Sequence, residues 1–160
     1  MITLDRIDIK LLELLQSDGR ISNIKLAEIV NLSATAVLSR VQKLDREGYI
    51  LGYEAKLNPV LLDKSFVVFV EISLDKTTPN ALDEFSKAVV LYPEIIECHM
   101  VSGGFDFLVK IRCENMEEFR RISGQVLWQL PGIRETRSYP VMEVIKESSK
   151  LNLMSKSKKS

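Results

Sequence analysis

The chain has 160 residues, of which 46% are hydrophobic and 28% are charged. This composition is typical of a soluble globular protein of one domain or two small ones, and it argues against a disordered or membrane-embedded chain. No apolar run approaches the roughly 18 residues that cross a bilayer, and the first residues lack the pattern of an export signal. Two cysteines without a CxxC spacing indicate no disulfide framework or zinc site. We therefore expect a cytoplasmic protein with no metal, no cofactor and no membrane partner.

Net charge is zero, but basic residues gather at the carboxyl terminus. Residues 1–52 carry 7 basic and 7 acidic residues, residues 53–145 carry 10 and 14, and residues 146–160 carry 5 and 1. The last segment is rich in Ser and Lys and has too few apolar residues to order itself by burial. We expect residues 148–160 to form a flexible basic tail, with weak and nonspecific attraction to polyanions.

Two helical patterns begin the chain. Asp5 precedes the first and Gly19 follows it, which suits an N-cap and a left-handed stop. Ser22 can cap the second, and Asn31, which tolerates positive φ, suits a tight turn after it. Apolar residues recur at helical spacing in both patterns and are expected in the core: Ile7, Leu11, Leu14, Leu15, Leu26, Ile29 and Val30.

A third helix is predicted between Ser33 as its N-cap and Gly48 as its stop. Val37, Val41 and Leu44 fall at i, i+4 and i+7 and face inward, while the opposite face is small and polar. Two helices with a short turn between them indicate a helix-turn-helix, whose second helix enters the major groove of DNA. Short side chains allow close approach, and basic ones reach base edges or phosphates. The residues expected to contact duplex DNA are Ser33, Thr35, Ala36, Ser39, Arg40 and Lys43.

Two short β-like runs follow in residues 49–59, on either side of Gly52, and we interpret them as the wing of a winged helix-turn-helix. The alternative is a three-helix bundle that does not bind DNA. The balanced charge of residues 1–52 favours that alternative, because phosphate contacts make DNA-binding domains basic. Dimerisation would compensate, since two modest half-site contacts act together.

Past Pro59 the apolar spacing alternates, and the elements follow the order βαββαβ of the ferredoxin-like fold. The fold class is therefore α+β. The strands are expected within residues 65–74, 94–104, 105–112 and 133–145, and the helices within residues 77–93 and 115–132.

The starts of these two helices carry capping signals. Thr78 is the expected N-cap of the first, with Pro79 at its first position, and Asn115 and Glu118 have capping-box spacing in the second. The stripe expected to face the sheet from the first helix is Leu82, Phe85 and Val89.

Both helices cover one face of a ferredoxin-like sheet, so the other face must find a different cover. That face would carry Val67, Phe69, Val101 and Leu108, which is too apolar to leave in water. A second copy of the sheet is the simplest cover, and we therefore predict a homodimer through this domain.

The stretch "SGGFDF" joins the two central strands. Consecutive Gly103 and Gly104 leave backbone N–H groups uncovered, which can hold a carboxylate, and the carboxylate of Asp106 can hold an ammonium group. Asp106 is expected to point away from its two Phe neighbours, toward the dimer side. One hypothesis is a site for the two charged ends of a free amino acid. The alternative is an ordinary Gly-Gly hairpin turn between two core aromatics.

Several motifs resemble, in the right order, the leucine-responsive and asparagine-sensing family, also called feast/famine transcription regulators. They are "LDRIDIKLLELLQSDGRISNIKLAEIVNLS", "GYEAKLNP", "VFVEISL", "ECHMVSGGFDFLVKI" and "LPGIRETRSYPVMEVIK". The resemblance runs from about residue 4 to about residue 150. It implies dimers that assemble into octamers or similar rings, an amino acid effector bound between dimers, and regulation of amino acid metabolism or transport. It also implies that Thr136 and Ser138 lie near the effector loop.

Two departures from the leucine-type pattern bear on specificity. Ala34 and Ala36 replace prolines of the recognition helix, and Gly104 replaces an acid of the effector loop. The first departure leaves the operator sequence open, and the second leaves two alternatives, an effector other than leucine or no effector.

We predict an amino-acid-modulated, DNA-binding transcription regulator. The alternative is an architectural protein that bends or wraps DNA without an effector, and an enzyme is disfavoured because no catalytic groups gather. The predicted domains are 1–52, DNA-binding; 53–65, wing end and linker; 66–147, effector-binding and oligomerisation; and 148–160, tail.

Overall fold

The computed structural model describes residues 3–75 and 79–153, and the chain divides into two compact units. The first unit combines residues 1–56 with residues 146–160, and the second comprises residues 57–145. The described part of the chain contains no helix long and apolar enough to cross a membrane.

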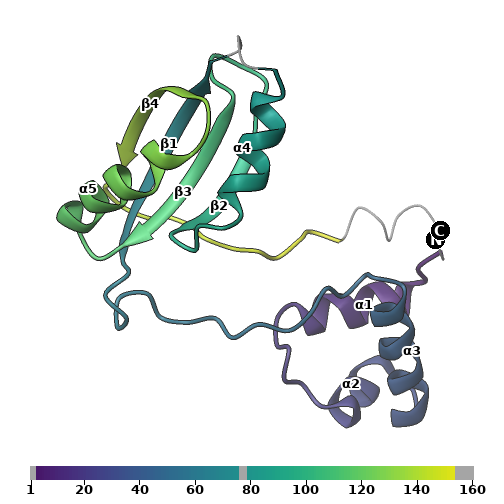
Figure 1. The fold of residues 1–160 in the computed structure, drawn as a ribbon. Coiled ribbons are helices and arrows are strands. Elements are labelled where there is room, and N and C mark those ends of the chain that lie inside the picture. The colour runs from purple at the N-terminus through teal and green to yellow at the C-terminus, as the bar shows by residue number, and fades with distance from the viewer. Residues whose placement is uncertain (1–2, 76–78, 154–160) are drawn as a thin grey trace. The chain divides into compact units, whose positions relative to one another are not determined.

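The described residues of the first unit form the helices α1 (Arg6–Leu15), α2 (Asn23–Val30) and α3 (Ala34–Arg46) (Figure 1). All three predicted N-caps are confirmed, because the side chains of Asp5, Ser22 and Ser33 each accept a hydrogen bond from a backbone N–H in the first turn. Asn31 ends α2 with φ 54°, as its tolerance of positive φ predicted. The turn between α2 and α3 is therefore set by local sequence.

Helix α3 ends in a Schellman motif at the predicted glycine. Gly48 has φ 75°, its N–H donates to the carbonyl of Asp45 (2.9 Å), and the Tyr49 N–H donates to the carbonyl of Leu44 (2.9 Å). The matching prediction for Gly19 is wrong, because α1 ends at Leu15 and Gly19 does not have positive φ. A Cβ at Gly19 would lie 3.0 Å from a ring carbon of Tyr53, so this glycine makes room for an aromatic side chain.

The core of the first unit gathers the inward residues of the three helices: Leu11, Leu15, Leu26, Ala27, Val37 and Leu44. Ile7, Leu14, Val30 and Val41 pack against it, half-buried. Ile29 was predicted in the core and is 42% exposed instead, while its place on α2 is taken by Ala27.

The predicted strands of the wing are not formed. Residues 50–58 form neither a helix nor a strand, and Leu51 is 98% exposed. Two short strands alone bury too little to stabilise a hairpin, which is why the pattern does not produce one here.

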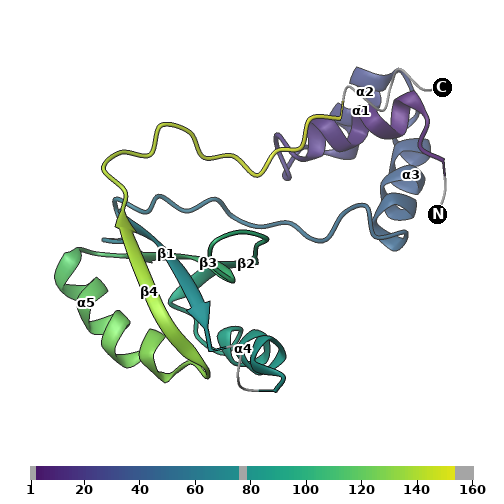
Figure 2. The same ribbon diagram turned by 90° about the horizontal axis from the view of Figure 1, so that it is seen from above.

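The second unit has the predicted βαββαβ order. Its elements are β1 (Phe66–Leu74), α4 (Ala81–Val89), β2 (Ile95–Met100), β3 (Phe107–Cys113), α5 (Met116–Gln125), the 3-10 helix η1 (Leu127–Gln129) and β4 (Ile133–Pro140). The antiparallel sheet has the order β2-β3-β1-β4, and α4 and α5 lie on the same side of it (Figure 2). The predicted ferredoxin-like topology is confirmed.

The core of this unit lies between the helices and the sheet. Alternate residues of β1, from Val68 to Leu74, are at most 1% exposed. The rings of Phe85 on α4 and Phe107 on β3 have centroids 4.4 Å apart. Cys98 packs against this core only partly, and Cys113 is buried in it.

The start of α4 differs from the prediction. The helix begins at Ala81 with Asn80 as its N-cap (φ 62°), so Pro79 is not its first residue, and Thr78 lies outside the described residues. Leu82 is 42% exposed, and Ala81 takes its expected place on the buried stripe.

The predicted capping box of α5 is half formed. The Asn115 side chain accepts from the Glu118 N–H, but the Glu118 carboxylate accepts from the Glu114 N–H instead of from Asn115. Both oxygens of the same Glu118 carboxylate accept hydrogen bonds from the Lys64 ammonium, each at 2.9 Å. This pair fixes the segment before β1 to the start of α5.

Candidate DNA-binding and effector sites

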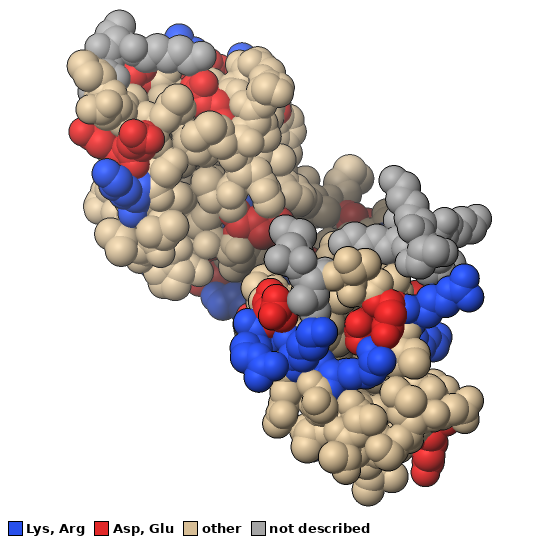
Figure 3. Space-filling view, turned by 90° about the vertical axis from the view of Figure 1, so that its right-hand side faces the viewer, with Lys and Arg blue, Asp and Glu red and all other residues tan. Residues whose placement is uncertain are grey.

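Helix α3 presents the predicted polar face to solvent. Thr35, Ser39, Gln42 and Lys43 are exposed, whereas Val37 is fully buried on the opposite side. Figure 3 shows that Lys and Arg side chains gather in a band on one face of the unit that holds α3. Small polar side chains beside basic ones form a surface that a nucleic acid backbone can approach.

Two of the predicted contact residues, Ser33 and Ala36, belong to the start of α3. Ser33 Oγ accepts from the Ala36 N–H (3.2 Å), so its hydroxyl oxygen satisfies one of the free donors of the first turn. Ala36 is half-buried, and its short side chain leaves space beside the exposed Thr35.

Arg40 is the predicted contact residue whose position differs most from expectation. Its Nη1 lies 2.7 Å from Asp5 Oδ2 and 2.7 Å from Asp8 Oδ1, across the interface between α3 and α1. The hydrogen bonds that Arg40 donates to the carboxylates of Asp5 and Asp8 raise the pKa of its guanidinium. Burial opposes ionisation of Asp5, but hydrogen bonds from the Asp8 N–H and from Arg40 outweigh it and lower the pKa of this carboxyl.

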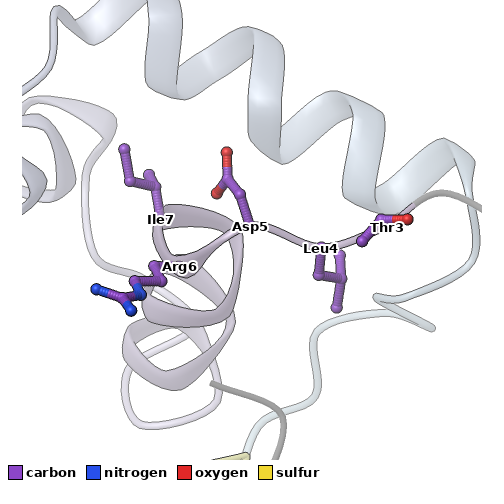
Figure 4. Close-up of a pocket in the computed structure, with 5 residues that line it drawn as sticks. All are labelled: Thr3, Leu4, Asp5, Arg6 and Ile7. Carbon is purple, nitrogen blue, oxygen red and sulfur yellow. The ribbon is translucent and has the colours of Figure 1, made fainter. Parts of the chain in front are cut away.

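A surface depression lies at the amino terminus of α1, lined by Thr3, Leu4, Asp5, Arg6 and Ile7 (Figure 4). These are consecutive residues whose side chains point in different directions. The Asp5 carboxylate is already bound to the Asp8 N–H and to Arg40. The depression therefore has no set of converging groups for a ligand. No group of three His, Cys, Asp or Glu among the described residues is placed to hold a metal.

The candidate effector loop connects β2 to β3 but is not a tight Gly-Gly turn. β2 ends at Met100 and β3 begins at Phe107, so residues 101–106 form a longer loop than predicted. Gly103 and Gly104 are exposed, lack positive φ, and have open space around each missing Cβ. A side chain would therefore fit at either position, and neither glycine is required by the fold of one chain.

Asp106 is hydrogen-bonded to the end of β1, just before β3 begins. Its N–H donates to the Ile72 carbonyl (2.9 Å), and its Oδ2 accepts from the Leu74 N–H (2.9 Å). The carboxylate thus takes the place of a backbone acceptor where β3 has not yet begun. The sequence does not predict this hydrogen bond, because it does not reveal which backbone N–H at the end of β1 lacks a backbone acceptor in the neighbouring strand.

Thr136 and Ser138 are not brought to Asp106 within one chain. Thr136 pairs with Ile72 and Ser138 with Val70, so both lie on the face of the sheet that carries the helices. β1 lies between β4 and the Asp106 loop, which corresponds to a separation of about 10 Å across two strand spacings. Within one chain β1 separates β4 from the loop, and a shared site for these residues stays a prediction.

Polar pairs occupy the open face of the sheet. Lys110 Nζ lies 2.9 Å from Glu97 Oε1, and Tyr139 donates to Glu71 at 3.0 Å. The hydrogen bond from Lys110 lowers the pKa of the Glu97 carboxyl. The His99 side chain is 61% exposed, and its Nε2 lies 3.4 Å from Glu97 Oε2.

The described part of the predicted flexible tail is bound to α1. The Gln16 side-chain amide both donates to the Leu151 carbonyl and accepts from the Leu151 N–H, each at 2.9 Å. Lys150 Nζ lies 3.3 Å from Ser17 Oγ. These contacts join residues 150 and 151 to α1, and the flexible basic tail of residues 148–160 stays a prediction.

Comparisons with known proteins agree with this architecture. Residues 4–50 match a domain family described as winged helix-turn-helix DNA-binding, and residues 67–151 match the Lrp/AsnC ligand binding domain. The chain is 50% identical over 148 residues to the leucine-responsive regulatory protein of Escherichia coli K12, covering 92% of this chain and 90% of that protein. The protein of that name from Klebsiella pneumoniae has the same identity and coverage.

Solved structures agree as well. A transcriptional regulator of Neisseria meningitidis in complex with L-Met is 31% identical, covers 96% of this chain and 99% of its own, and has a TM-score of 0.90. An AsnC family regulator of Agrobacterium tumefaciens is also 31% identical, covers 94% and 97%, and has a TM-score of 0.83. These matches confirm the predicted order of the two domains.

Proposed function

Because the chain belongs to the Lrp/AsnC family of transcription regulators, we propose that it regulates amino acid metabolism or transport genes in response to a free amino acid. The family consists of regulators, so the prediction of a DNA-binding regulator and not an enzyme is confirmed. The proposed parts are the DNA contacts of α3, the effector and the assembly that joins them.

The proposed DNA contact is the exposed face of α3. The observation that carries it is the exposed polar face of Thr35, Ser39 and Lys43, opposite the buried Val37 within a matched helix-turn-helix. Small side chains allow the helix to enter the major groove, and Lys43 supplies a charge for a phosphate or a base edge. In this proposal Ser33 and Ala36 contact the DNA from the first turn of α3, where the Ser33 hydroxyl also accepts from the Ala36 N–H.

The proposed effector is a free amino acid bound at the loop of Gly103, Gly104 and Asp106, with Thr136 and Ser138 contributed by another copy. The matched ligand-binding domain supports a small-molecule role, and the similar Neisseria regulator was solved with L-Met. The family's leucine-responsive members support the same chemical class. We propose a homodimer through the open face of the sheet, assembling further to an octamer or similar ring.

DNA binding is tested with a labelled duplex that the protein selects from a random pool, titrated over a range of salt concentrations. Lys43→Ala should lower the slope of log affinity against log salt by about 0.9, the value of one phosphate contact. Lys87→Ala, which removes an exposed charge from α4, is the matched control and should leave the slope unchanged. If no duplex is selected, the DNA-binding proposal fails.

Effector binding is tested by thermal shift and calorimetry with each of the twenty amino acids. Asp106→Asn keeps an oxygen that can accept from the Leu74 N–H but removes the charge for an ammonium group. It should weaken binding of the active amino acid at least tenfold, with little change in melting temperature. If no amino acid binds but DNA binding persists, the architectural alternative replaces the sensor.

A further inference from the structure

The ion pair of Arg40 is built into the cap of α1. Asp5 Oδ1 accepts from the Asp8 N–H (2.8 Å), and Asp8 Oδ2 accepts from the Asp5 N–H (3.2 Å). The remaining oxygens, Asp5 Oδ2 and Asp8 Oδ1, each lie 2.7 Å from Arg40 Nη1. All four carboxylate oxygens are therefore engaged, and one nitrogen of α3 binds both acids of the α1 cap.

We propose that Arg40 is a positioning residue, which holds α3 at a fixed angle to the start of α1 instead of contacting DNA itself. This inference rests on the proposed DNA binding by α3, and it reassigns one residue of the predicted contact set. Arg40 would act through the exposed residues of its own helix, since their approach to a groove depends on how α3 is held.

The cost of releasing Arg40 supports this role. Asp8 is only 7% exposed, so moving the guanidinium to a phosphate would leave a buried carboxylate without its charged partner. The apolar contacts of Val37 and Leu44 attract without fixing an angle, because burial of apolar surface is non-directional. Charge-assisted hydrogen bonds are directional, and here they join the two helices near the buried side of α1.

The two roles make opposite predictions for Asp8→Asn. The amide still accepts from the Asp5 N–H, but it loses the charge that holds Arg40. If Arg40 positions α3, this variant weakens binding to the selected duplex about tenfold, as Arg40→Ala does, and the salt slope stays unchanged in both. The double variant, Asp8→Asn with Arg40→Ala, binds the duplex as tightly as Arg40→Ala alone, because the two residues act as one unit. If Arg40 contacts phosphate, Asp8→Asn strengthens binding and Arg40→Ala lowers the slope by about 0.9.

Asp45→Asn is the matched control for the loss of one negative charge, because Asp45 lies at the far end of α3. Asp5→Asn is the second acidic variant, since Asn remains a good N-cap and preserves folding. Hydrogen exchange in α1 and α3, measured on the full protein without DNA, should accelerate in Asp8→Asn and in Arg40→Ala. Unchanged exchange, or stronger DNA binding by Asp8→Asn, overturns the positioning role. Failure of the wild type to select a duplex refutes the proposed function, while the exchange experiment still decides the role of Arg40.

Discussion

The two units have separate cores, and this predicts that they unfold separately. Leu44 on α3 is 1% exposed within the first core, so Leu44→Ala should cost about 2–5 kcal/mol of the first unit's unfolding free energy. For a unit of this size, each kcal/mol lowers the melting temperature by about 4–8 °C. The melting temperature of the first unit should therefore fall by at least about 8 °C, while that of the second unit stays unchanged.

Two optical probes separate the transitions. Trp128 is the only tryptophan of the chain and lies in the second unit, so its fluorescence reports that unit alone. Far-ultraviolet circular dichroism reports the helices of both units. Leu44→Ala should lower the midpoint of the first unit's transition in the dichroism and leave the midpoint of the Trp128 transition unchanged. Leu74 is an equally buried leucine of the second core, so Leu74→Ala should lower the midpoint of the Trp128 transition. If Leu44→Ala shifts both probes together, the units unfold as one block and the argument from separate cores is refuted.

Three further predictions concern caps and ion pairs. Ser33→Ala should destabilise the first unit by about 1 kcal/mol in thermal unfolding, Ser22→Ala should do the same at α2, and Ser33→Asn should keep the stability of the wild type. Asp5 has a folded-state pKa below 3.8, so its stabilisation is present above that value and is lost as pH falls through the lower folded pKa. Urea midpoints over an acidic pH series should show this loss, and Arg40→Ala should reduce it. Lys64→Ala should return the pKa of Glu118, now lowered by the Lys64 hydrogen bond, toward 4.5, as carboxyl titration by NMR would show.

The features that could be predicted from the sequence are those set by a few neighbouring residues. The caps at Ser22 and Ser33 and the left-handed residues Asn31 and Gly48 depend on backbone groups within one turn, and each was found where its signal lies. The alternation in β1 shows which of its residues face the helices. Local chemistry therefore determined both the helix-turn-helix and the βαββαβ order.

The contacts that could not be predicted join residues far apart in the chain. The partners of Arg40 lie 35 and 32 positions away, and Gln16 binds a backbone 135 positions away. An Arg on the border of a polar helix face carries no signal that separates a DNA contact from an ion pair. The acid spacing at the start of α1 indicates a cap, but it does not indicate that the cap has a second partner on α3.

The geometry of the predicted effector residues bears on assembly. The loop of residues 101–106 and the side chains of Thr136 and Ser138 are separated by β1, and the latter two face the helix side of the sheet. One chain therefore cannot surround a small ligand with all five residues. A site that uses them all needs β4 of one copy beside the loop of another, so binding of the ligand would be linked to association of the copies. Because linkage is reciprocal, the amino acid would favour the assembly that completes its site, and the assembly would raise affinity for the amino acid.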